Sequence, residues 1–229
     1  MTPVIAIDGP SGAGKSTVAR AVADALGLVV LDTGAMYRAV TLAVLERGVS
    51  VDDGPACGQV ARAADLAIDG GVRLDGRDVT ETIRGPDVTT AVSAVSAHPE
   101  VRTVLVPLQR AWLEEHGGGV VEGRDIGTVV FPDAVVKVFL TASHDERARR
   151  RQQDEVAAAR DVEVERVRES LARRDRADSI RSASPMQPAS DAVVLDTTHL
   201  PVPDIVAAIV DRYRARVEGA AGSAGAGEQ

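Results

Sequence analysis

The 229-residue sequence has little cysteine, lysine or aromatic content and no long uncharged run. Its single cysteine, Cys57, has no intrachain disulfide partner, which fits a reducing compartment such as the cytoplasm. The longest stretch without a charged residue, 88–99, is shorter than the roughly 18 apolar residues of a membrane span. The first residues also show neither the basic start nor the cleavage-like stretch of a secretory signal. We therefore expect a cytoplasmic protein that does not act on a membrane.

The charge of the chain is acidic overall but uneven. The 34 acidic residues outnumber the 26 basic ones, whereas a nucleic-acid-binding protein usually has a basic surface. Aromatic residues make up only 2%, which leaves few platforms for base stacking. Between residues 147 and 181, however, eleven arginines stand against eight acidic residues. The pattern excludes broad nucleic-acid binding and indicates a local cationic site.

Apolar runs and turn residues predict the architecture. Short buried strands are expected at 4–7, 28–31, 120–121, 134–140 and 192–195, and helices at 15–26, 35–46, 99–115, from 143, 163–176 and 204–217. This alternation predicts an α/β fold, with a parallel sheet covered by helices, in a single domain over 1–218. An Asp-Gly-Gly turn near residue 70 predicts a hairpin, so 51–97 is expected to be a small antiparallel insertion. We expect a flexible tail over 219–229.

The segment between the first strand and the first helix fits the phosphate-binding loop (P-loop) pattern G-x-x-x-x-G-K-[ST]. In such a loop, glycines let backbone N–H groups surround phosphate oxygens, and the helix N-terminus adds positive charge. Lys15 is expected to reach the β- and γ-phosphates, and Ser16 to bind Mg²⁺. Asp32, at the end of the second strand, is either a second metal ligand through water or a cap at the end of that strand. The residues expected to hold ATP are Gly9, Pro10, Ser11, Gly12, Ala13, Gly14, Lys15, Ser16 and Thr17.

A P-loop is compatible with a GTPase switch, an ATPase motor or a small-molecule kinase. The guanine-reading motif Asn-Lys-x-Asp is absent, since Lys15 and Lys137 are the only lysines and neither fits it. A motor of this size would need partners that the sequence does not reveal. A compact α/β domain with an insertion and an arginine-rich segment favours a kinase that closes over two substrates.

The arginines also indicate the class of acceptor. A hydroxyl acceptor benefits from a base, whereas a phosphate acceptor is already an anion and needs cations to bring it to the donor. Arg147, Arg150 and Arg151 share one face of a helix and could surround the transferring phosphate. Alternatively, they form a solvated face with i,i+4 ion pairs to Asp154 and Glu155. The arginine content favours a phosphate acceptor.

A second group on one helical face has mixed charge. Arg174, Asp178 and Arg181 are spaced i, i+4, i+7, which would let them hold an anion and a sugar hydroxyl together. The same spacing is typical of a surface salt-bridge ladder, and the spacing alone does not decide between the two.

Three segments are similar to a known family. Residues 9–17 (GPSGAGKST), 31–38 (LDTGAMYR) and 122–133 (EGRDIGTVVFPD) resemble bacterial cytidylate kinases, and the resemblance covers about residues 3–218. It implies a P-loop three-layer kinase that phosphorylates CMP and dCMP with ATP and Mg²⁺, and it implies a helical lid over 143–162. The expected partners are these small nucleotides and no nucleic acid, and the expected state is a monomer. The alternatives are a UMP-preferring nucleoside monophosphate kinase and a nucleotide sensor without activity.

The resemblance also implies roles for individual residues. The residues expected near the acceptor base are Thr33, Ser93 and Arg102, the last two on the cytosine edge, and Asp125 beside the cytosine. Tyr37 and Arg38, adjacent in one motif, are expected to bind the acceptor, and Arg38 and Arg124 to bind its phosphate. Arg174 and Asp178 are expected on the ribose, and Arg181 on the acceptor side. Those expected to act in catalysis are Lys15, Arg124, Arg147 and Arg151. An Asp can accept a hydrogen bond from the cytosine amino group, which uracil does not have.

Overall fold

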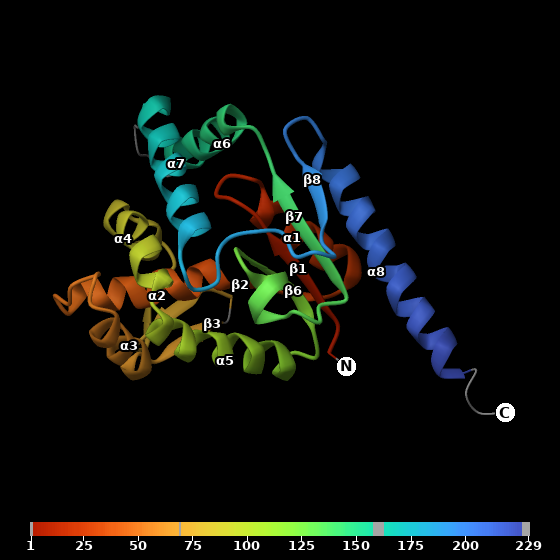
Figure 1. Cartoon of the computed structure of the whole chain (residues 1–229), viewed down its shortest axis with the longest axis horizontal. Coiled ribbons are helices and arrows are strands. Elements are labelled where there is room, and N and C mark those ends of the chain that lie inside the picture. The colour runs from red at the N-terminus through yellow and green to blue at the C-terminus, as the bar shows by residue number, and fades with distance from the viewer. Residues whose placement is uncertain (1, 69, 158–162, 226–229) are drawn as a thin grey trace.

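The computed structural model describes residues 2–68, 70–157 and 163–225. Within them, five strands form a parallel sheet in the order β2-β6-β1-β7-β8 (Figure 1). The strands are β1 (Val4–Asp8), β2 (Val29–Asp32), β6 (Gly119–Gly123), β7 (Val136–Thr141) and β8 (Val193–Asp196). All residues of β1 and β6 are buried, which is typical of a parallel sheet covered on both faces. The prediction of an α/β fold with a parallel sheet is confirmed.

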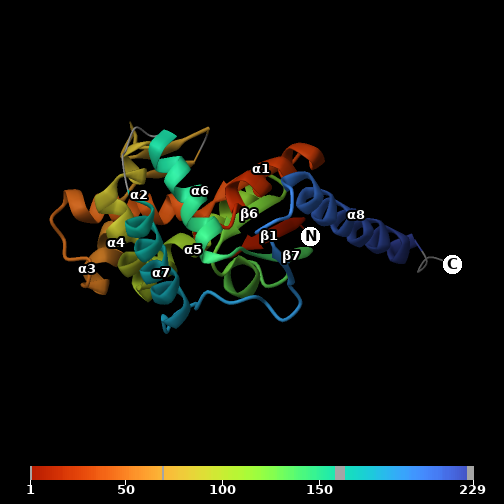
Figure 2. The same ribbon diagram turned by 90° about the horizontal axis from the view of Figure 1, so that it is seen from above.

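Helices cover both faces of this sheet and produce three layers. Successive side chains of a strand point to opposite faces. Val4 and Ala6 therefore join the core with α2 (Thr33–Glu46) and α5 (Pro99–Glu115), whereas Ile5 and Ile7 join the core with α1 (Lys15–Leu26) and α8 (Val202–Gly225). Figure 2 shows α8 at the opposite end of the molecule from α3 (Gly54–Ala63).

The insertion predicted over 51–97 is antiparallel only in its centre. The strands β3 (Leu66–Ile68), β4 (Val72–Leu74) and β5 (Arg77–Asp78) form an antiparallel sheet, as the turn residues predicted. The same segment contains α3, a 3₁₀ turn η1 (Thr82–Arg84) and α4 (Pro86–Ala97), which the sequence reading missed. Val72 and Leu74 are buried in the same core as α2, so the insertion packs directly on the domain that carries the parallel sheet.

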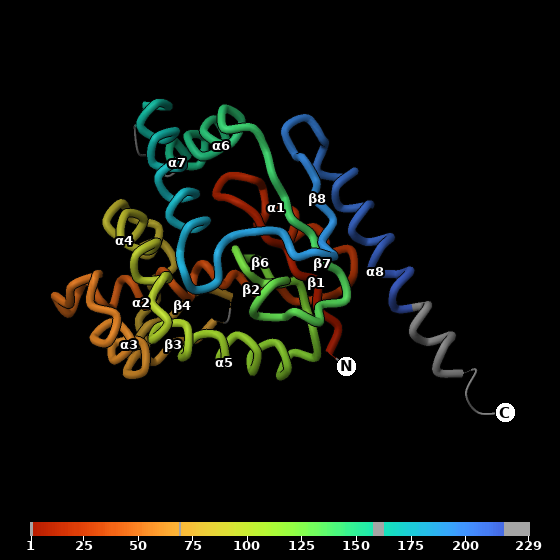
Figure 3. The backbone as a smooth tube through the Cα atoms, viewed as in Figure 1, coloured from red at the N-terminus to blue at the C-terminus, as the bar shows by residue number. Residues whose placement is uncertain are grey.

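Two charged helices lie above the carboxyl edge of the sheet. Helix α6 (His144–Ala157) packs against α7 (Val164–Ile180) through Ala148, Val167 and Leu171, and α7 also contacts α4 (Figure 3). Residues 158–162 of the expected lid lie outside the described residues. The lid therefore stays a prediction, but its first helix is in place.

The C-terminal helix is longer than predicted. Helix α8 continues past residue 217 to Gly225, and residues 226–229 of the expected tail lie outside the described residues. Among the described helices, none combines the length and the hydropathy that crossing a membrane requires.

Candidate active site

A cavity of about 680 Å³ lies at the carboxyl edge of the sheet. The parallel strands β1, β2 and β6 all end there, since strands that run the same way have their carboxyl ends at one edge. Among the described residues, nine arginines and Lys15 line this cavity, against six carboxylates. The cavity is thus built for an anionic occupant.

Most of the predicted site residues meet in this one cavity. Its lining includes the predicted residues Ser11, Gly12, Gly14, Lys15, Ser16, Thr17, Asp32, Thr33, Tyr37, Arg38, Ser93, Arg102, Arg124, Asp125, Arg151, Arg174, Asp178 and Arg181. Gly9, Pro10, Ala13 and Arg147 are outside the lining.

The loop between β1 and α1 has the backbone that its glycines allow. Gly9, Gly12 and Gly14 have φ angles of 145°, 78° and 87°, in the region that disfavours residues with a side chain. A Cβ at Gly9 would in addition overlap with the backbone carbonyl oxygen of Leu140 on β7. The loop therefore curls tightly at the start of α1, and the first N–H groups of a helix, which lack partners within the helix, can bind an anion.

Lys15 lies inside this curl. Its Nζ donates a hydrogen bond to the carbonyl oxygen of Pro10 at 2.8 Å, and the residue is only 8% exposed. Burial, followed by the nearby charge of Arg124, lowers the pKa of Lys15 to about 7. A bound polyphosphate would supply the negative charge that restores its proton.

Two carboxylates face Lys15 from neighbouring strands. Glu122, at the end of β6, accepts a hydrogen bond from the Ser16 hydroxyl at 2.9 Å, and burial and the charge of Asp32 raise its pKa to about 7. Asp32 caps α2 by accepting from the Ala35 N–H at 3.1 Å and also lines the cavity. The cap predicted for Asp32 is therefore present.

These oxygens fit a magnesium ion. Ser16, Asp32 and Glu122 offer hydroxyl and carboxylate oxygens, the ligands that Mg²⁺ prefers, and a cation would offset the burial and the charge of Asp32 that raise the pKa of Glu122. Within the described ranges, no group of three His, Cys, Asp or Glu could form a complete metal site. Mg²⁺ usually keeps several waters and binds substrate phosphates, so it needs no such cage.

On the other side of the cavity, Asp125 is held between two arginines. Arg102 and Arg181 both form ion pairs with its carboxylate, that of Arg181 at 3.2 Å, and all three side chains are at most 6% exposed. The Arg102 guanidinium also lies over the ring of Tyr37, 5.5 Å from its centroid. This cluster presents a carboxylate and a planar fork of donors side by side.

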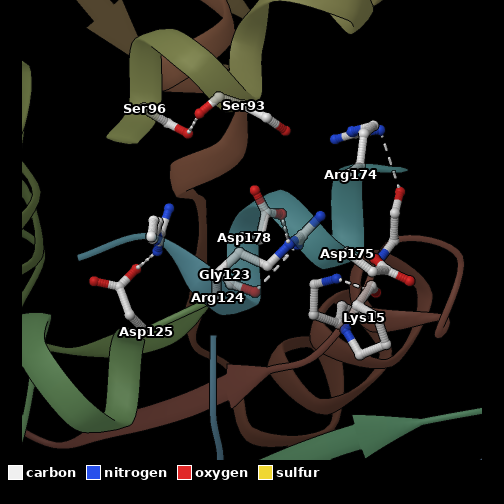
Figure 4. A network of polar contacts seen from close by, with 12 residues as sticks. Lys15, Ser93, Ser96, Gly123, Arg124, Asp125, Arg174, Asp175 and Asp178 are labelled. Carbon is white, nitrogen blue, oxygen red and sulfur yellow. Dashed lines mark hydrogen bonds and ion pairs between the residues drawn. The ribbon is translucent and has the colours of Figure 1, made fainter. Parts of the chain in front are cut away.

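A second group of cations lies between the P-loop with Lys15 and the cluster around Asp125. Arg124 donates to Asp178 at 3.0 Å, and Figure 4 shows Arg124 between Asp125 and Lys15. Burial, followed by the charge of Arg174, lowers the pKa of Arg38 to about 9. Burial and the charge of Arg124 similarly lower the pKa of Arg174 to about 10. Repulsion among these guanidiniums is what an incoming phosphate would relieve.

Small hydroxyls complete the lining. The Thr33 hydroxyl donates to the Glu122 carbonyl oxygen at 2.7 Å, and Ser93 projects from α4 beside Ser96, whose hydroxyl donates to the Ser93 carbonyl oxygen at 3.2 Å (Figure 4). Thr33 and Ser93 thus both line the cavity, and their roles toward an acceptor stay predictions.

The arginines of α6 do not act as the single face that their spacing predicted. Arg150 and Arg151 line the cavity, whereas Arg147 is outside its lining and forms a buried ion pair with Asp175 of α7. Arg147 also donates to the carbonyl oxygen of Ser11, at 3.2 Å, so it ties α6 to the P-loop. The expected pair of Arg151 with Glu155 is present, but Arg150 pairs with Glu146 rather than with Asp154.

Comparison with known proteins identifies the family of this chain. Residues 5–215 match the family model described as cytidylate kinase. The chain belongs to the cytidylate kinase family. A cytidylate kinase of Mycobacterium avium is 51% identical over 94% of this chain and 96% of its own length.

Other relatives are longer. A bifunctional pantoate ligase/cytidylate kinase of Trichormus variabilis is also 51% identical over 94% of this chain, which spans only 42% of that relative. Among solved structures, an uncharacterised protein from Eubacterium ventriosum shares the fold at a TM-score of 0.55 and 13% identity, covering 94% of this chain and 99% of its own.

Sequence reasoning missed two carboxylates of this cytidylate kinase family member. Glu122 was part of a recognised motif without a role, and its position directly after the apolar pair Val120–Val121 could have placed it near the carboxyl edge, where β6 ends at Gly123. Asp8 ends β1 in the same way, and its carboxylate accepts two backbone hydrogen bonds from residues beyond Asp125.

Proposed function

We propose that the protein transfers the γ-phosphoryl group of ATP to CMP and dCMP, giving ADP and CDP or dCDP. The proposal is carried by one observation: a P-loop and a buried arginine cluster line the same cavity. Such a cavity brings two repelling nucleotide anions together, which is the main task of a phosphoryl transferase with a phosphate acceptor.

In this reaction an oxygen of the CMP phosphate attacks the γ-phosphorus, and the bond between the γ-phosphorus and the bridging oxygen to the β-phosphate breaks. The acceptor oxygen is already ionised near neutral pH, so no protein base is required. Lys15 stabilises the charge on the donor phosphates, and Arg38, Arg124 and Arg181 hold the acceptor phosphate. Arg151, from α6, neutralises the transferring group.

Two further groups support the donor. Mg²⁺, when bound with ATP, would neutralise charge on the β- and γ-phosphates, and Ser16, Asp32 and Glu122 would hold it directly or through water. Arg147 positions the P-loop through its bond to Ser11 rather than touching phosphate.

The acceptor base is recognised by the cluster around Asp125. Its carboxylate would accept a hydrogen bond from the cytosine amino group, and Arg102 would donate to the ring nitrogen and carbonyl. Uracil presents a carbonyl where cytosine has the amino group, which leaves the buried carboxylate facing an oxygen. The ribose would meet Arg174 and Asp178. The expected monomeric state and cytoplasmic location stay predictions.

The test is an ADP-release assay with ATP and each of CMP, dCMP, UMP, AMP and GMP. We expect turnover with CMP and dCMP at least tenfold above the rest in kcat/KM. A preference for UMP or AMP contradicts the cytidylate assignment, and tight binding of ATP and CMP without CDP formation indicates a sensor. Lys15→Met should abolish turnover with little change in CMP binding. Lys137→Met is the matched control, since Lys137 pairs with the exposed Asp191 outside the cavity.

A further inference from the structure

Asp8 joins the donor loop to the acceptor end of the site without lining the cavity. It is the last residue of β1, immediately before Gly9 of the P-loop, and is 4% exposed. Its two carboxylate oxygens accept separate hydrogen bonds from the backbone N–H groups of Ile126 and Gly127, each at 2.8 Å. One side chain thus connects residues 118 positions apart.

The segment that Asp8 holds carries two residues of the acceptor site. Ile126 and Gly127 begin the short π-helix η2 (Ile126–Val130), and they directly follow Arg124 and Asp125. The first N–H groups of any helix lack partners within the helix, and a side chain at the preceding position normally accepts from them. The orientation of the Arg124–Asp125 turn therefore depends on how these N–H groups are satisfied.

The residue in the local capping position does not do this. Asp125 is the N-cap of η2, yet its side chain makes no capping hydrogen bond. Its carboxylate instead pairs with Arg102 and Arg181 in the cavity. Asp8, which lies on the neighbouring strand β1, caps η2 instead. The Asp125 carboxylate is thus left free of capping and directed toward the acceptor.

The chemistry of Asp8 suits that task. Burial works against its ionised form, and the two N–H donors offset part of that cost. An asparagine of the same shape offers one acceptor oxygen and one N–H₂ group, so it could satisfy only one of the two donors and would confront the other.

We infer that Asp8 is a positioning residue for acceptor recognition: it caps η2 in place of Asp125 and so fixes Asp125 and Arg124 relative to the P-loop. The inference rests on the proposed function for the identity of the acceptor, but its geometry involves only this chain.

The test is the variant Asp8→Asn, with KM measured separately for CMP and ATP. Loss of a charge-assisted hydrogen bond predicts a rise of about tenfold or more in KM for CMP. KM for ATP should change by less than threefold, and the preference for CMP over UMP in kcat/KM should fall. Asp53→Asn is the matched control, because Asp53 caps α3 through the Ala56 N–H at 2.9 Å and is not among the residues that line the cavity, so it should change neither KM.

Equal rises in both KM values, or unchanged values in a folded variant, overturn the inference. If Asp8→Asn does not fold, Asp8→Glu retains both oxygens but displaces them by one methylene, and the same selective rise in KM for CMP is expected. The wild-type protein is assayed in parallel with all acceptors. If it prefers another nucleotide, the proposed function fails, and the role of Asp8 is read from KM for that acceptor against KM for ATP.

Discussion

Binding of ATP should take up a proton at Lys15. In the free site, burial and the charge of Arg124 lower the pKa of Lys15 to about 7. At pH 8 such a group carries about 0.1 proton, and a bound triphosphate, by favouring the cation, should bring it close to 1. Binding at pH 8 is therefore expected to take up well over half a proton per site, about 0.9 for a pKa of about 7.

The uptake of a proton on binding predicts that the affinity for ATP decreases with rising pH. Because the complex holds more protons than the free protein, affinity for the nucleotide should fall as the pH rises above 7, by up to about tenfold per pH unit. Calorimetry with a magnesium complex of a non-hydrolysable ATP analogue measures the uptake, since the apparent enthalpy depends on the ionisation enthalpy of the buffer. The Lys15→Met variant supplies the control and should lose this dependence.

Two results would refute the reasoning. One is a binding enthalpy that is the same in phosphate and Tris buffers at pH 8. The other is a proton uptake that persists undiminished in Lys15→Met, which would assign the proton to another group.

Two substitutions test other parts of the account. Gly9→Ala should prevent ATP binding or unfold the loop, because the φ of 145° at Gly9 and the Leu140 carbonyl leave no place for a Cβ. The control is Gly48→Ala, where φ is 65° and the space is open, and it should cost only about 1 kcal/mol in the free energy of unfolding. Comparable stability of the two variants by denaturant unfolding, with full ATP binding, would disprove the first expectation. Asp178→Ala releases Arg124 and should raise KM for CMP about tenfold in a folded protein. Its unfolding instead would assign Asp178 to a purely structural ion pair.

The periodic parts of the fold were predictable because local signals agreed with the tertiary structure. The bounds predicted for α1 and α5 match, and α1 ends at Gly27, which adopts the left-handed conformation that favours glycine. The helices α3 and α4 were missed, although Asp53 and a proline at the start of α3 are helix-start signals. The buried face of α3 includes two glycines and Cys57, and that of α4 includes three valines; these residues have low helix propensity, and packing against the core outweighs it.

The site was predictable where its residues belong to one contiguous motif. It was not predictable where the order of strands in the sheet brings together residues that are distant in the sequence. The P-loop could be read from spacing alone. Asp8, Asp32 and Glu122 become neighbours only through the order β2-β6-β1, which no local pattern contains. Helical spacing likewise put Arg147 on a shared face with Arg150 but did not reveal that Asp175, on another helix, holds it.

A crystal structure with CMP bound tests the central claim most directly. We predict that the CMP phosphate contacts at least two of Arg38, Arg124 and Arg181, with the cytosine against Arg102 and Asp125. A CMP molecule whose phosphate lies in the P-loop curl around Lys15, or outside this cavity altogether, would contradict the account.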